Sequence, residues 1–230
     1  MLKILSQLLD WLFPRRCYCC RKTSQTSICK NCLSSIKILE PIPIKIINNT
    51  KIYSSTVYSG VTKKLIRAIK YHQKQEFDTE LAALMFKFWQ TLNEKEHSYE
   101  IIPTPTFAFR LKQRKYDHIK LICNKFAQMT NSKVNTELLK RTKDTKPQYK
   151  LTLKQREENL KNAFSCDKAA YKGGHILLVD DICTTGATLS EMIKTLHSSG
   201  ITDITALCCS CNESYIAATS SNIIHSSSSF

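Results

Sequence analysis

The chain has 230 residues, 42% of them hydrophobic, and a formal net charge of +15. This length and composition allow a full hydrophobic core, which excludes wholesale disorder and suits one complete domain with a small appendage. No run approaches the roughly 18 consecutive apolar residues of a membrane-spanning helix, and the opening segment lacks the cleavage site of a secretory signal, so we expect a cytoplasmic protein without a membrane span.

The N-terminal part carries five of the eleven cysteines. Leucines at helical spacing predict a first helix that ends at Pro14. Cys17 and Cys20 then form one C-x-x-C pair, and Cys29 and Cys32 form a second pair after eight intervening residues. Four thiolates at this spacing are typical of a structural zinc site. We therefore predict a zinc-binding module within residues 1–50.

Two other interpretations of these cysteines remain open. One is a redox C-x-x-C pair, although the βαβ context of thioredoxin-like proteins is missing. The other is a set of incidental thiols. Cys19 is the spare residue, because a ligand at that position would break the spacing of the pair. Cys208, Cys209 and Cys211 can suggest a second metal site, but buried strand thiols explain them more simply.

From residue 51 onward the hydrophobic pattern alternates between strand and helix periods. The expected strands are residues 52–58, 99–102, 138–140, 175–179 and 201–208. The expected helices are residues 61–72, 79–92, about 109–128, 152–162 and 189–197. This alternation predicts an α/β domain with a mostly parallel sheet covered on both faces, spanning residues 51–212. The Ser-rich residues 213–230 are expected to form a flexible tail.

Positive charge is concentrated between residues 110 and 161, where fifteen Lys and Arg oppose five Asp and Glu. Such a field attracts polyanions, for example nucleic acid or pyrophosphate. The alternative is a solvated, lysine-rich surface with no ligand.

The most informative segment is HILLVDDICTTGATLSE, which begins at His175. The strand of residues 175–179 ends in adjacent carboxylates, Asp180 and Asp181, followed by hydroxyls, a glycine and a helix start. Backbone N–H groups of residues 184–188 can cradle a phosphate at the positive helix N-terminus, and Gly186 allows the tight turn. The alternatives are an Asp that merely caps the helix and a nucleotide P-loop, whose spacing is absent.

This segment resembles the phosphoribosyl pyrophosphate signature of type I phosphoribosyltransferases. The resemblance implies that the loop holds the 5′-phosphate and that Asp180 and Asp181, as the catalytic acids, hold the ribose hydroxyls. Mg²⁺ would be chelated mainly by pyrophosphate and sugar oxygens. The protein would contribute positioning and charge stabilisation. The implied binding residues are Asp180, Asp181, Ile182, Cys183, Thr184, Thr185, Gly186, Ala187 and Thr188.

Cysteine pairs in front of this signature resemble the ComF (ComFC-like) competence family, from about Leu8 to Cys208. The segments YSGVTKKLIRAIKYH, IIPTP and TKPQYKLTLKQREENLKNAF follow that family's order. The family's R-G-Y-N-like stretch is altered here, since Lys115 follows Arg114. By resemblance, the pyrophosphate loop comprises Pro103, Thr104, Pro105 and Thr106.

The family implies handling of single-stranded DNA during natural transformation, beside a ComFA-type helicase. Four basic residues are candidates for contacts to pyrophosphate or to a DNA backbone, although a surface charge or a salt bridge explains each equally well: Lys70, Arg110, Arg114 and Arg156. Three functions remain open. The chain is a DNA-handling factor that binds phosphoribosyl pyrophosphate, an active phosphoribosyltransferase on an unidentified acceptor, or a zinc-anchored adaptor for a helicase.

Overall fold

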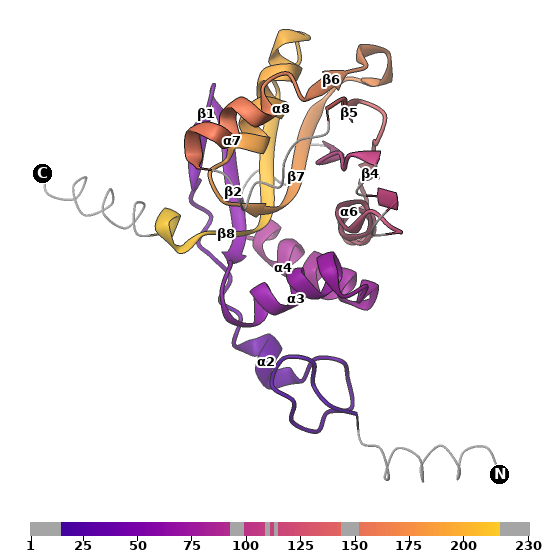
Figure 1. Ribbon diagram of the computed structural model, residues 1–230, viewed down its shortest axis with the longest axis vertical. Coiled ribbons are helices and arrows are strands. Elements are labelled where there is room, and N and C mark those ends of the chain that lie inside the picture. Colours follow the sequence, from indigo (N-terminus) through magenta and orange to yellow (C-terminus); the bar gives the residue numbers. More distant parts are fainter. Residues whose placement is uncertain (1–14, 93–98, 109–110, 113–114, 144–151, 217–230) are drawn as a thin grey trace, which may run out of the picture.

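The computed structural model describes residues 15–92, 99–108, 111–112, 115–143 and 152–216. A six-stranded sheet runs through the described chain in the order β1-β2-β8-β7-β3-β4 (Figure 1). Its neighbouring strands are parallel except for β1, which is antiparallel to β2. The predicted, mostly parallel sheet is therefore confirmed. The strands are β1 (Lys45–Ile47), β2 (Thr50–Val57), β3 (Tyr99–Pro103), β4 (Lys133–Val134), β7 (His175–Cys183) and β8 (Ile204–Cys211).

Both faces of the sheet are buried. This explains why residues 176–179 of β7 are all apolar. Leu177 and Val179 belong to one core, whereas Ile176 and Leu178 belong to the other. Side chains alternate across a strand, so a strand covered on both faces needs apolar residues at every position. The first core also holds residues of helices α3 (Gly60–Tyr71), α4 (Asp78–Trp89) and α6 (His118–Thr130). The second core holds residues of α8 (Ala187–Ser198) and the last residue of α7 (Leu153–Leu160).

Smaller elements complete the described chain. A two-stranded antiparallel sheet pairs β5 (Leu139–Arg141) with β6 (Phe164–Cys166). Two short 3-10 turns are η1 (Gln75–Phe77) and η3 (Lys168–Ala170). None of the helices described is long and apolar enough to cross a membrane.

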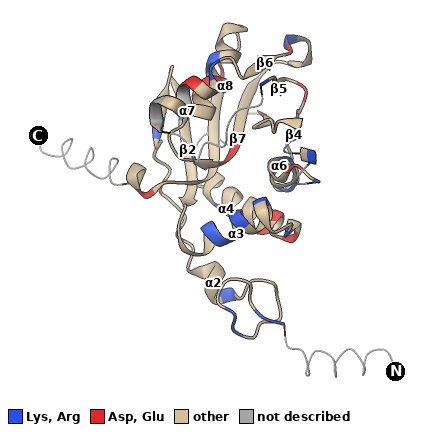
Figure 2. Ribbon diagram, in the orientation of Figure 1, with Lys and Arg blue, Asp and Glu red and all other residues tan. Residues whose placement is uncertain are grey.

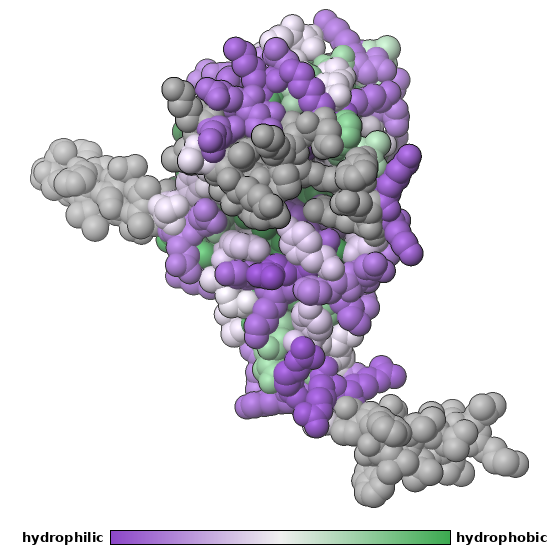
Figure 3. All heavy atoms as spheres, in the orientation of Figure 1, coloured by the Kyte–Doolittle hydropathy of each residue, from purple (hydrophilic) through white to green (hydrophobic). Residues whose placement is uncertain are grey.

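The cysteine module, residues 15–39, lies at the narrow end of the molecule beside α3 (Figures 1 and 3). It contains the short helix α2 (Lys30–Ser34). The Tyr18 ring packs on Phe77 with centroids 5.1 Å apart, and the Lys64 ammonium donates to the Cys19 carbonyl at 2.6 Å. Buried side chains of the module join the first core, so the module is docked on the domain.

Three expected elements had wrong boundaries. The strand expected at residues 201–208 is β8, Ile204–Cys211. The single helix expected over residues 109–128 is interrupted: Ala108, Leu111 and Lys112 are helical, but residues 115–117 are not. A new helix, α6, begins at His118, where Asp117 caps it by accepting the N–H groups of Ile119 at 3.1 Å and Lys120 at 3.2 Å. The strand expected to end at residue 179 continues to Cys183, because the neighbouring strand β8 keeps pairing with it. Segments of strong periodicity were placed well, and the errors arose where tertiary partners decide the end.

The thiols of Cys208, Cys209 and Cys211 are all buried within β8. Cys209 faces the first core and the other two face the second. Among the described residues, the group that can hold a metal ion is the N-terminal one. The interpretation of these three cysteines as strand thiols is consistent with this arrangement.

Candidate functional site

Asp180 and Asp181 lie inside strand β7, near its carboxyl end (Figure 2). Asp180 pairs in register with Cys208 of β8, and both acids are at least nine-tenths buried. Ligands of parallel sheets bind at the carboxyl ends of the strands. The two carboxylates therefore stand at the edge where a ligand is expected, on consecutive residues of a central strand.

Asp181 is held by two cationic or polar groups from different helices. Its Oδ2 atom lies 2.5 Å from the Lys70 ammonium of α3 and 2.6 Å from His118 Nε2 of α6. His118 is only 3% exposed. Burial acts to raise the pKa of Asp181, but the Lys70 charge and the His118 hydrogen bond outweigh it and hold the pKa below its usual range. Asp181 is thus a buried carboxylate that stays ionised.

Asp180 behaves differently. Burial, together with the adjacent charge of Asp181, raises the pKa of Asp180 to about 7. One of its oxygens accepts the Asp181 backbone N–H at 2.9 Å. Consecutive carboxylates therefore differ in protonation behaviour, which is common at functional sites.

The loop after β7 turns sharply into α8. Gly186 is the N-cap of this helix, with φ of 77°, a conformation that favours glycine. A shallow hollow at the turn is lined by the predicted residues Asp180, Ile182, Cys183, Thr184, Gly186, Ala187 and Thr188, together with Leu189. Thr185 differs in using its hydroxyl to accept the Ala187 N–H at 3.3 Å. The structure thus gathers the predicted loop residues at the N-terminus of a 12-residue helix, where an anion is favoured.

Lys45 reaches this loop from the edge strand β1. Its ammonium donates to the Thr185 carbonyl at 3.1 Å. A Cβ added to Gly186 would lie 3.4 Å from Cδ of Lys45 and 3.5 Å from its Nζ. Lys45 and His118 were not identified as candidates from the sequence. No local motif marks either one, because each is brought to the site by a distant element.

The predicted pyrophosphate loop begins where β3 ends beside β7. Pro103 pairs in register with Val179. Thr104 is buried and donates to the Val179 carbonyl twice, through its N–H at 2.8 Å and its hydroxyl at 3.0 Å. Pro105 and Thr106 follow, partly exposed. Two segments that lie 75 residues apart in the chain thus meet one residue before Asp180.

The structure describes the side chain of one of the four basic candidates and not those of the other three. Lys70 lies in the site, paired with Asp181. Arg110 and Arg114 lie outside the described residues, and so does the side chain of Arg156, whose backbone is in α7. Their predicted contacts stay predictions.

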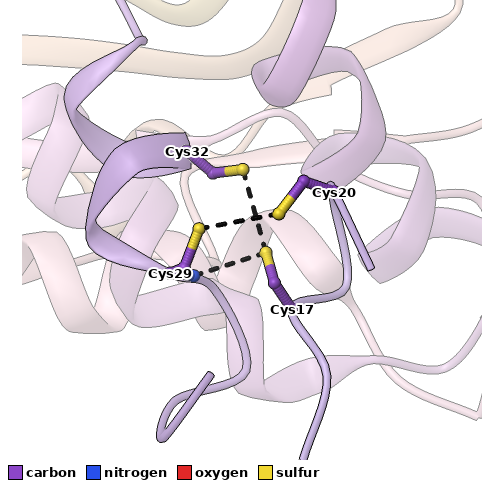
Figure 4. A group of neighbouring side chains, drawn as sticks. All are labelled: Cys17, Cys20, Cys29 and Cys32. Carbon is purple, nitrogen blue, oxygen red and sulfur yellow. Dashed lines mark hydrogen bonds between the residues drawn. The ribbon is translucent and has the colours of Figure 1, made fainter. Parts of the chain in front are cut away.

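The four cysteines predicted as zinc ligands form one cluster (Figure 4). Their Sγ atoms all lie within 4.8 Å of one another, with 3.8 Å between Cys17 and Cys32 and 3.7 Å between Cys20 and Cys29. A tetrahedral zinc ion with Zn–S bonds of about 2.3 Å requires S–S edges of about 3.8 Å. The cluster can therefore hold a zinc ion with little rearrangement.

The backbone around Cys17 favours its thiolate form, whereas burial raises the pKa of Cys32. Burial acts to raise the pKa of Cys17, but hydrogen bonds from backbone N–H groups, that of Cys29 first, lower it to about 6. That N–H lies 3.3 Å from the Cys17 sulfur. Cys19 lies outside the cluster, and burial raises its pKa to about 11.

Comparison with known proteins agrees with this geometry. Residues 122–218 match the family described as the phosphoribosyl transferase domain. Competence protein F of Haemophilus influenzae is 32% identical over 145 residues, which are 61% of this chain and 63% of that protein. Over this stretch the chain is similar to competence protein F, and it contains a segment similar to a phosphoribosyl transferase domain. Its alignment spans less than two thirds of that relative's length.

Two further proteins are similar to this chain. The DNA utilization protein YhgH of Escherichia coli K12 is 26% identical over 156 residues, 66% of this chain and 67% of that protein. The adenine phosphoribosyl transferase of Trypanosoma brucei superposes with a TM-score of 0.40 and 8% identity, covering 81% of this chain and 79% of that one. The matched family segment contains the loop after β7 but begins after Lys45, Lys70 and His118.

Proposed function

We propose that this protein binds phosphoribosyl pyrophosphate with Mg²⁺ at the loop between β7 and α8, and that it acts in handling single-stranded DNA during natural transformation. The observation that carries the first part is the meeting of three features at one sheet edge. These are the Gly186 turn at a helix N-terminus, the acids of β7 and the Thr104 segment of β3. The names of the relatives, competence protein F and DNA utilization protein, support the second part.

In this proposal each group has a separate task. The amides and hydroxyls of residues 184–188 hold the 5′-phosphate, and the Lys45 ammonium adds a positive charge beside them. Asp180 accepts a ribose hydroxyl. Both described contacts to the Asp181 carboxylate end on Oδ2, so Oδ1 is available for the second hydroxyl. Residues 103–106 lie where the pyrophosphate would be, and Mg²⁺ would bind mainly oxygens of the ligand.

The cysteine cluster is proposed to hold a structural zinc ion, and a ComFA-type helicase is proposed as a partner. Four ligands fill the tetrahedral shell and leave no open position for catalysis. All eleven cysteines are free thiols, and thiolate ligands require a reduced state. Both features support a reducing cytoplasm as the compartment.

The phosphate task of Lys45 gives the sharpest test of phosphoribosyl binding. In calorimetry, the wild type should bind phosphoribosyl pyrophosphate with Mg²⁺, ribose 5-phosphate and pyrophosphate. Lys45→Met should weaken ribose 5-phosphate binding about tenfold, since a charge-assisted hydrogen bond contributes about 1.5–3 kcal/mol. The affinity for pyrophosphate should not change, because Lys45 contacts the loop after β7 and not the proposed pyrophosphate loop, residues 103–106. Lys168→Met, which removes a lysine that lies beside Gly200 rather than the loop, is the control.

If none of the three ligands gives a binding heat, the phosphoribosyl site is excluded. Equal losses of affinity for ribose 5-phosphate and pyrophosphate would exclude the specific role of Lys45.

An alternative function is that of an active phosphoribosyltransferase. The unequal pKa values of the two acids favour this alternative. If labelled pyrophosphate is released when nucleobases are added, and Asp180→Asn abolishes the release, the chain is an enzyme.

The DNA part of the proposal predicts a salt-dependent affinity. Basic residues continue from the cysteine module onto α3, where Lys63, Lys64 and Arg67 are exposed (Figure 2). Anisotropy of a labelled oligothymidylate should show binding that weakens with salt, with a log–log slope of about −0.7 for each phosphate neutralised. In the double variant Lys63→Gln and Arg67→Gln, the slope should become less steep by the amount that corresponds to one or two phosphate contacts. Binding that is absent, or insensitive to salt, would contradict the DNA role.

A further inference from the structure

A cavity of about 480 Å³ opens between the cysteine module and the carboxyl end of β2. Its walls come from the segment after α2, the end of β2, the first turn of α3 and the segment after β8. Its volume is in the range of small-molecule sites. The lining residues are Ser35, Ile36, Lys37, Val57, Ser59, Gly60, Val61, Thr62, Glu213 and Ile216.

The first turn of α3 presents uncapped donors to this cavity. The helix has 12 residues, and its N-cap residue Ser59 makes no side-chain capping bond. The amides of residues 60–62 lack helical acceptors, as in the first turn of any helix. A Cβ on Gly60 would meet nothing within 4 Å, so the space beside Gly60 is open. The dipole of the helix adds positive potential at the same place.

Thr62 gives a second and independent indication of a ligand. Its side chain lines the cavity although the residue is only 3% exposed. Within the described part of the chain, its hydroxyl has no hydrogen-bond partner. Thr62 is not among the described residues with a buried unpaired side-chain atom, so its hydroxyl oxygen is accessible from the cavity, and a group that enters the cavity can bond to it.

The lining of the cavity combines polar and apolar residues. The hydroxyls of Ser59 and Thr62 and the ammonium of Lys37 accompany the free amides, and the first turn of α3 contains no acidic residue. Glu213 is the acidic residue of the lining. The remaining walls are apolar, formed by Ile36, Val57, Val61 and Ile216. A ligand that suits this lining carries both a phosphate and an apolar group.

The cavity shares a wall with the loop after β7. The N–H of Asn212 donates to the Cys183 carbonyl at 3.2 Å. Tyr215, between the lining residues Glu213 and Ile216, brings its hydroxyl to 3.7 Å from where a Gly186 Cβ would lie. The segment 212–216 therefore separates two neighbouring sites.

We propose that this cavity is a nucleotide-binding site, distinct from the phosphoribosyl loop. The phosphate lies on the first turn of α3 beside Thr62 and Lys37, and the base lies against the apolar wall. A free mononucleotide and the phosphorylated end of a DNA strand offer the same chemistry.

The test is calorimetry with thymidine 5′-monophosphate, in the presence of saturating ribose 5-phosphate so that the loop after β7 is occupied. The wild type should bind, and thymidine should bind far more weakly. Thr62→Val, of similar shape, and Lys37→Met should each weaken binding about tenfold. Lys30→Met, an exposed lysine of α2 outside the lining, should bind like the wild type.

Ser59→Asp separates a binding defect from a folding defect. An aspartate at the N-cap should bond the free amides and raise the melting temperature, while its charge should exclude the phosphate and abolish binding. If Ser59→Asp and Thr62→Val bind the nucleotide like the wild type, the proposal is wrong.

A second measurement identifies the source. If a 5′-phosphorylated oligothymidylate displaces the mononucleotide and its unphosphorylated form does not, the ligand is a strand end. If neither displaces it, the ligand is a free nucleotide. Displacement by both forms equally would mean that a terminal phosphate is not recognised and would overturn the assignment.

Discussion

Asp181→Asn is expected to destabilise the folded protein by about 3–5 kcal/mol, because the substitution leaves Lys70 as a buried charge without its partner. The ammonium and the carboxylate are 2.5 Å apart, with side chains only 17% and 8% exposed. Urea denaturation at pH 7 measures the loss. In the same variant, affinity for phosphoribosyl pyrophosphate should fall, since the second acid no longer accepts a sugar hydroxyl.

A matched double variant separates the charge effect from general damage. Adding Lys70→Met to Asp181→Asn removes both charges, and most of the lost stability should return. The pH dependence has a definite sign. The pKa of Asp181 is lowered in the folded protein, so its contribution is present above the unfolded value of about 4 and disappears as the pH falls through the folded value. Equal stabilities of the wild type and Asp181→Asn at pH 7 would contradict this account.

Cys17→Ser is expected to abolish zinc binding and unfold the cysteine module. A structural zinc ion contributes about 10–16 kcal/mol in small zinc-finger peptides, far more than the few buried side chains of this module can supply. Elemental analysis should find one zinc per wild-type chain and none in the variant. Hydrogen exchange should show loss of protection in residues 17–32, with the sheet retained.

Cys19→Ser is the control for this experiment. Cys19 is buried, as Cys17 and Cys32 are, but lies outside the cluster, so this variant should keep its zinc while losing some stability from the buried hydroxyl. Loss of zinc from Cys19→Ser, or full zinc content in Cys17→Ser, would show that the assigned ligand set is wrong.

Several features of this chain were predictable because they depend on local pattern. The zinc cluster follows from the spacing of two C-x-x-C pairs, since each pair places two sulfurs on one turn. The phosphate loop follows from hydroxyls and a glycine between an apolar strand and a helix, and Gly186 does adopt a positive φ. The strand β7 was recognisable from its apolar run, but its end was not, because pairing with β8 extends it through both acids.

What the sequence by itself determined is therefore the kind of domain, the four-cysteine cluster and the loop after β7, all of which are encoded within short stretches of chain. Only the tertiary structure decided which partners reach them. Lys45 contacts Thr185, which is 140 residues away in the sequence, and His118 contacts Asp181, which is 63 residues away. Neither contact has a local signature, because each depends on how distant elements pack around the sheet. The unequal pKa values of Asp180 and Asp181 have the same origin, since burial and the position of the Lys70 charge exist only in the folded chain.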